Sequence, residues 1–191
     1  IILKRTSVRF FILILRKTKM NLEHKCKICG EIHNDYPALT YSSPFSYHCL
    51  SEEEKKLYKA FLNSDFCTIE YPDQTDRFIR VVLKQKIIDS ELTLDYGLWV
   101  SLSEKSYDDY FSNFKNENHE NRYFGWLEIT IPEYIFNENI PTTVITKLGN
   151  ERPEIFPHSD FDHPFVRDFY QGITKEEAEK RIHNILSNIT N

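Results

Sequence analysis

The sequence predicts an α+β fold in which helices pack on one side of a mainly antiparallel sheet. Strand-like runs rich in β-branched and aromatic residues follow one another through short connections, and helical patterns flank them. From Leu94 to Leu102 every second residue is apolar, which is typical of a strand with one buried face. After residue 20 the chain has no linker rich in Gly, Ser or Pro and no internal repeat. We therefore expect residues 20–191 to form a single domain.

The predicted helices carry recognisable start signals. Residues 51–63 open with Ser51 and Glu54, which have the spacing of a capping box. A second helix is expected from about Ser106, and its tyrosines and phenylalanines recur at helical spacing. A short helix is expected over residues 164–170. The last helix begins after Thr174 and places its apolar residues on one stripe.

Six strands are predicted, the last of them at an edge of the sheet. Their ranges are 66–71, 77–88, 94–103, 123–131, 142–148 and 152–157. Because no helix separates most of them, an antiparallel meander is favoured.

The charge of the chain argues against nucleic-acid binding. Residues 1–19 contain six basic residues and no acidic one, which leaves 18 basic and 29 acidic residues in the rest. An acidic surface repels phosphate backbones, and no local basic patch is evident. We expect an unknown protein or small-molecule partner instead of a nucleic acid.

The first 19 residues are interpreted as a non-globular or upstream-translated extension, with Met20, the only methionine, as the natural start. Their apolar run, 10–15, is too short to span a bilayer, and no secretory cleavage pattern follows it. A membrane-surface anchor is the alternative, but we expect no membrane partner. Four cysteines are too few for a disulfide scaffold, which favours a cytoplasmic location.

Cys26 and Cys29 are the strongest chemical signal in the sequence. They are separated by two residues and followed by Gly30 and His33, a spacing that suits one tetrahedral zinc ion. A redox pair or plain thiols are the alternatives. His33 is the expected third ligand, and the fourth is open among Cys49, Cys67, His158 and His163. We expect His163, because the preceding Asp162 could orient its ring, so the Asp162–His163 turn should meet the two cysteines in space.

Two further groups of residues are candidates for a ligand site. Trp99 and Ser101 lie on the face of their strand opposite the apolar residues, where Trp99 is either covered by a helix or lines a groove. Asp162, His163 and Arg152 could form a catalytic cluster with His163 as general base. The simpler interpretation is that Asp162 caps the helix over 164–170 and Arg152 pairs with a surface acid.

Several short motifs occur in an order that resembles a bacterial family, domain of unknown function 2199. They are Cys26-Lys-Ile-Cys29-Gly30, Phe78-Ile79-Arg80, Tyr96-Gly97-Leu98-Trp99, Phe124-Gly125-Trp126-Leu127, Arg152-Pro153, Asp162-His163-Pro164 and Gln171-Gly172-Ile173. The resemblance runs from about His24 to Leu186. It implies a single intracellular bacterial domain with an amino-terminal knuckle and no established activity. Lys27 and the Asn-rich stretch 113–121 depart from the family pattern.

Taken together, these features suggest a binding or regulatory module stabilised by a structural zinc ion. The alternative is a metal-assisted hydrolase, in which the same zinc keeps an open position for water and His163 or Asp162 transfers protons. The number of protein ligands separates them, since four indicate a closed structural site and three indicate a catalytic one.

Overall fold

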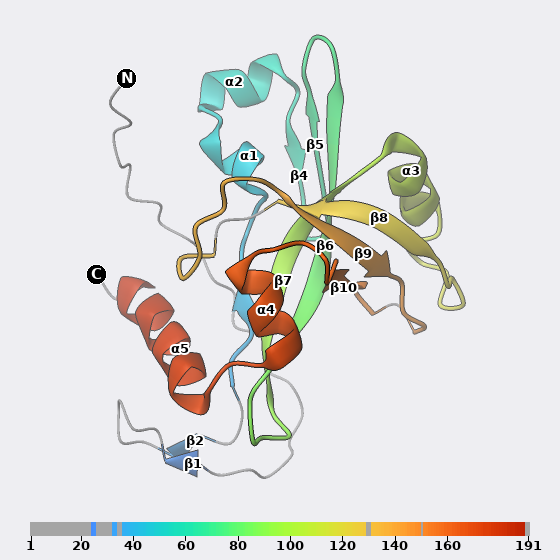
Figure 1. Ribbon diagram of the computed structural model, residues 1–191. Coiled ribbons are helices and arrows are strands. Elements are labelled where there is room, and N and C mark those ends of the chain that lie inside the picture. Colours follow the sequence, from blue (N-terminus) through green and yellow to red (C-terminus); the bar gives the residue numbers. More distant parts are fainter. Residues whose placement is uncertain (1–23, 26–31, 34–35, 129–130, 150, 190–191) are drawn as a thin grey trace.

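The computed structural model describes residues 24–25, 32–33, 36–128, 131–149 and 151–189 (Figure 1). The predicted extension over residues 1–19 lies outside them. In chain order the elements are β1 (His24–Lys25), β2 (Ile32–His33), β3 (Leu39–Thr40), α1 (Phe45–Cys49), α2 (Glu52–Leu57), β4 (Phe61–Leu62), β5 (Phe66–Glu70), β6 (Thr75–Lys86), β7 (Thr93–Leu102), α3 (Glu104–Ser112), β8 (Arg122–Leu127), β9 (Ile140–Ile145), β10 (Glu154–Pro157), α4 (Pro164–Gln171) and α5 (Lys175–Ile189).

Five strands close into a barrel. The strands β6 to β10 pair in chain order and antiparallel, and β10 returns to β6 in parallel, where Glu154 lies beside Val82. β3 adds to β7 in parallel, and β5 followed by β4 extends the sheet beyond β6. The predicted α+β class and mainly antiparallel sheet are confirmed, but the sheet is not an open layer.

The barrel interior is filled by the apolar residues that alternate along the strands. On β7 every second residue from Leu94 to Leu102 is buried, as the alternation predicts. Ile79, Val81 and Leu83 of β6 point to the same core. Burying these side chains supplies the main favourable contribution to folding.

Helices surround the barrel instead of covering one side, so that part of the prediction was wrong. Tyr107 and Tyr110 of α3 contact Phe66, whereas Phe165 of α4 and Ile182 of α5 join the core elsewhere. Figure 1 shows α3 beside β8, α1 and α2 beside β4, and α4 in front of β7, with α5 next to α4. A closed barrel has no single buried face, so apolar helix stripes pack at its ends and on its outside.

Trp99 belongs to a second, smaller cluster on the outside of the barrel. It is fully buried with Cys67, Ile69 and Phe78, and residues from α1 to β4 pack over them. The indole Nε1 donates to the backbone oxygen of Tyr41 at 3.0 Å. The sequence left open whether Trp99 is covered or lines a groove. The structure shows that it is covered, so Trp99 lines no open groove.

The helix predicted over residues 51–63 is shorter than expected. The capping box of Ser51 and Glu54 is present, but α2 ends at Leu57. Lys59 has a positive φ of 43°, and Phe61 then pairs with Thr68 across β4 and β5. Pairing with β5 outweighed the helical periodicity of this segment.

The predicted edge strand over 152–157 is an interior strand. β10 lies between β9 and β6 and completes the barrel. Long-range pairing, which local sequence does not show, decides its position.

In the part of the chain that the structure describes, no helix is long and apolar enough to cross a membrane.

Candidate ligand-binding site

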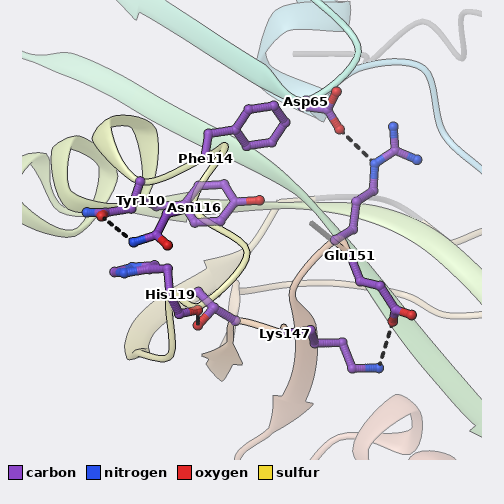
Figure 2. A pocket seen from close by; sticks show the side chains of 10 residues that line it. Asp65, Tyr110, Phe114, Asn116, His119, Lys147 and Glu151 are labelled. Atoms are coloured by element: carbon purple, nitrogen blue, oxygen red, sulfur yellow. Dashed lines mark hydrogen bonds and ion pairs between the residues drawn. The ribbon is translucent and has the colours of Figure 1, made fainter. Parts of the chain in front are cut away.

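A pocket of about 350 Å³ opens between segments that are distant in the sequence (Figure 2). One residue precedes β5, five come from α3 and the loop after it, and four lie between β9 and β10. The lining residues are Asp65, Tyr110, Asn113, Phe114, Asn116, His119, Thr146, Lys147, Glu151 and Arg152.

An ion pair between Asp65 and Arg152 forms one wall. The Nε atom of Arg152 donates to Oδ1 of Asp65 at 2.7 Å, and both side chains are mostly buried. Asn63 holds Asp65 in place, because its Oδ1 accepts from the backbone N–H groups of Asp65 and Phe66. The carboxylate is therefore fixed before β5 begins.

Arg80 lies next to this pair. Its backbone N–H donates to the backbone oxygen of Asp65, and its guanidinium lies 5.6 Å from the Trp99 ring. Burial, and secondly the positive charge of Arg152, lower the pKa of Arg80 to about 10. Its Nε is buried without a hydrogen-bond partner among the described residues. Two guanidinium groups thus lie close to one carboxylate.

Lys147 provides a third positive charge. Its ammonium lies 2.9 Å from Glu154 and 3.6 Å from Glu151, as Figure 2 shows for Glu151. The hydrogen bond to Glu154 is the main reason that the pKa of Lys147 is raised. Glu151 is exposed, so its pairing with Lys147 is screened by water.

The opposite wall is the Asn-rich loop after α3. The hydroxyl of Thr146 donates to the backbone oxygen of His119 at 2.9 Å and accepts from the backbone N–H of Asn121 at 2.7 Å. At the end of α3, Asn113 donates to the backbone oxygen of Asp109. The Asn-rich stretch 113–121 is therefore hydrogen-bonded into the wall of the pocket.

Asp109, His119 and Tyr123 fasten this loop to the barrel. The hydroxyl of Tyr123 donates to Oδ2 of Asp109 at 2.6 Å, and His119 Nε2 lies 2.8 Å from the same hydroxyl. This hydrogen bond from Tyr123 is the first reason that the pKa of Asp109 is lowered. The pKa of Tyr123 is raised by burial and by Asp109.

Aromatic side chains form the apolar part of the pocket. The ring of Phe114 lies 5.9 Å from that of Tyr110, and both contact Phe66. Burial raises the pKa of Tyr110, which stays a neutral phenol. The pocket thus combines charged groups on one wall with aromatic surface on another, an arrangement suited to a small polar ligand.

His163 has a structural role at the start of α4. Its Nδ1 accepts from the backbone N–H of Phe165 at 3.1 Å, which makes His163 the N-cap of α4. Its Nε2 lies 3.0 Å from the backbone oxygen of Ile135, to which it donates. Both ring nitrogens are therefore occupied, and neither is free to bind zinc or act as a general base.

Asp162 does not cap α4, contrary to the simpler prediction. Its side chain is 92% exposed and pairs with Arg167 at 2.8 Å. The turn adopted by the chain points the following residue, His163, at the open N–H groups of the helix.

The other candidates in the body of the protein are dispersed. Ser101 lies beside Trp126 on the outer face of the barrel, apart from the pocket. Arg152 pairs with an acid, but this acid is the mostly buried Asp65 and not the surface acid that was predicted. Among the described residues, Arg152 is the one sequence candidate that lines the pocket.

The other three residues considered as the fourth zinc ligand, Cys49, Cys67 and His158, lie in different environments. Cys67 is a buried thiol whose pKa desolvation raises to about 12, whereas Cys49 is exposed. His158 Nε2 lies 3.2 Å from the hydroxyl of Thr143.

Cys26 and Cys29 lie outside the described residues, so their meeting with His163 stays a prediction. For His33 the structure describes the backbone, which pairs with that of His24 across the antiparallel strands β1 and β2. Among the described residues, no group of three or more His, Cys, Asp and Glu side chains is arranged to hold a metal ion.

Sequence reasoning did not identify Asp65, His119 or Lys147 as pocket residues, or Arg80 as their charged neighbour. Each is an ordinary polar residue when seen alone, and only the fold brings them together. The Phe78-Ile79-Arg80 motif was the available signal, because Arg80 is a charged residue inside the otherwise apolar run 78–83 and needs a reason to be there.

The comparisons with known proteins give one result. A family described as an uncharacterized protein conserved in bacteria, domain of unknown function 2199, matches residues 25–173. No curated protein and no solved structure matches the chain. The matched range includes every strand of the barrel, the Asp65–Arg152 pair and the cap at His163. The chain therefore belongs to the domain of unknown function 2199 family.

Proposed function

We propose that this protein is a binding module that takes a small anionic ligand in the pocket. The observation that carries the proposal is the excess of positive charge around Asp65. Arg152 bonds its carboxylate, and the guanidinium of Arg80, which does not line the pocket itself, is near enough for the two guanidinium groups to repel each other. A bound anion would offset that repulsion and use donors that the protein leaves available.

An organic carboxylate fits this site better than a bare inorganic ion. The Nη groups of Arg152 form a planar fork that matches a carboxylate. The Asn113 and Asn116 amides offer neutral polar contacts, and Tyr110 with Phe114 covers an apolar part of the ligand. Lys147 can exchange its weak contact with exposed Glu151 for the ligand.

Titration followed by amide NMR tests the proposal. The probes are sodium benzoate, sodium succinate and inorganic phosphate, each up to about 10 mM at constant ionic strength. We expect benzoate to give saturable shifts in residues 113–121 and 146–152, and phosphate to bind more weakly. Arg152→Gln should weaken benzoate binding at least about tenfold, the usual loss for one charge-assisted hydrogen bond.

Arg167→Gln is the matched control, since Arg167 also pairs with an aspartate but on the exposed surface of α4. It should leave benzoate binding unchanged. Lys147→Gln provides a second variant in case Arg152→Gln does not fold. Shifts that never saturate, or equal weakening by the Arg152 and Arg167 variants, would contradict a site in this pocket.

We also propose, from the spacing of Cys26, Cys29 and His33, that the amino-terminal segment binds one structural zinc ion. The antiparallel pairing of β1 and β2 supports it, because two short strands flanking Cys-x-x-Cys are a common frame for a zinc knuckle. That pairing also makes His24 a candidate for the fourth position. A bound zinc ion would stabilise the folded form of this segment.

Elemental analysis of the purified protein tests the zinc proposal. We expect about one zinc ion per chain, lost in Cys26→Ser and retained in Cys49→Ser. His24→Ala then tests the proposed fourth ligand, whereas His163→Ala should retain the zinc ion because both ring nitrogens of His163 are hydrogen-bonded. Wild-type protein that is free of metal, with a melting temperature that a chelator does not change, would contradict the proposal.

A further inference from the structure

The outer side of β8 to β10 carries four exposed aromatic residues and the half-buried His158, here together named the aromatic face: Phe124, Trp126, Phe156, His158 and Tyr170. Phe124 is 50% exposed, Trp126 43% and Tyr170 49%. The rings of Phe124 and Trp126 lie 5.0 Å apart, and that of Phe124 lies 5.6 Å from His158. Large aromatic side chains left in water on one continuous surface mark an interaction site.

Strand register shows that the aromatic face is continuous. Phe124 on β8 lies opposite Thr143 on β9, which lies opposite Phe156 on β10. Trp126 lies opposite Pro141 in the next row, and the His158 backbone bonds to Pro141. The Tyr170 hydroxyl donates to the backbone oxygen of Pro157, which joins α4 to the same surface.

The strand pairing restricts how a partner can bind to the aromatic face. β8, β9 and β10 each have a neighbouring strand on both sides, so no strand edge is open for an added strand. A partner must therefore pack on the side chains, face against face.

Charges at the two ends of the aromatic face are opposite in sign. Exposed Arg122 is in the row at one end, where Glu154 on β10 is paired with Lys147, so this end keeps a net positive charge. Exposed Asp160 lies two residues after His158 at the other end. The rows between them carry no charged side chain on β9, where Pro141, Thr143 and Ile145 point outward. A neutral aromatic centre between opposite charges is complementary to itself when rotated by 180°.

We propose that the aromatic face binds a second copy of this chain and forms a two-fold dimer. The two-fold rotation brings Arg122 of each protomer opposite Asp160 of the other, which gives two ion pairs. Trp126 and Phe124 of both protomers then lie in the centre of the interface. Buried aromatic residues with flanking ion pairs are the usual composition of such interfaces.

Sedimentation equilibrium of the full chain from about 1 to 100 μM tests this proposal. We expect a dimer whose dissociation constant rises at least tenfold in Trp126→Lys. Leu57→Lys, an exposed apolar residue at the end of α2, is the control and should leave the dimer unchanged. Circular dichroism verifies that each variant is folded.

A charge exchange makes the test specific to the predicted pairing. Arg122→Glu should weaken the dimer, and adding Asp160→Lys to it should restore most of the affinity, because the ion pairs re-form with reversed sign. A wild-type monomer at every concentration overturns the proposal and leaves the surface to a different protein. A dimer that Trp126→Lys does not weaken also overturns it.

Discussion

Arg152 donates through Nε to Oδ1 of Asp65 at 2.7 Å, although 87 residues separate them. The bond joins the start of β5 to the start of β10, next to the place where β10 meets β6. That closing contact is short, with Val82 bonded to Pro153 and Glu154 beside Val82. The ion pair therefore both closes the barrel and forms a wall of the pocket.

Asp65→Asn should lower the free energy of unfolding by about 1–2 kcal/mol, because it removes a mostly buried charge from between two arginines. Urea denaturation measures the change. Asp162→Asn is the matched control: its ion pair with Arg167 is exposed, so the effect should stay within about 0.5 kcal/mol. Equal effects of the two substitutions would show that the Asp65 pair does not stabilise the closed barrel.

His163→Ala should destabilise the protein by about 1–2 kcal/mol, the usual loss for an N-cap, and leave the zinc content unchanged. His163→Asn should recover part of the loss, since an asparagine side chain also accepts from the helix N–H groups. Thermal unfolding and metal analysis give the two results. A fall in zinc content in the alanine variant would restore His163 as a ligand.

Arg181→Met should destabilise the protein by about 3–5 kcal/mol. Arg181 is 3% exposed and bonds Tyr96, Tyr134 and Glu177, so its removal leaves buried polar groups without a partner. Lys180→Met, one position earlier and on the surface of α5, is the control, with a change within about 0.5 kcal/mol. Similar urea midpoints for both variants would exclude a role of Arg181 in holding α5 on the barrel.

Asp109→Asn should destabilise the protein modestly at neutral pH and less in acid. The pKa of Asp109 is lowered in the folded state, so its contribution is present above the unfolded pKa, about 3.9, and is lost as the pH falls through the folded value. The difference in urea midpoint between wild type and variant should be constant from pH 7 to about 5 and shrink below about pH 4. A difference that is constant throughout this range would mean that the carboxylate charge does not stabilise the loop.

Local patterns in the sequence predicted the longer helices and strands, and in places their ends, but not α1 or the two-residue strands β1 to β4. The alternation along β7, the capping box at Ser51 and the helix after Thr174 are confirmed, because each depends on neighbouring residues alone. The helix over 51–63 was too long, since the pairing of Phe61 with Thr68 is invisible to local periodicity.

The sequence by itself determined the α+β class, the buried alternation of the strands and the family to which the chain belongs. Only the tertiary structure decided that the sheet closes into a barrel, that Trp99 is covered, and that His163 caps a helix. It also decided that Asp65 meets Arg152. These are contacts between residues far apart in the chain, where many pairings satisfy the same local pattern and the packing of the whole core selects one.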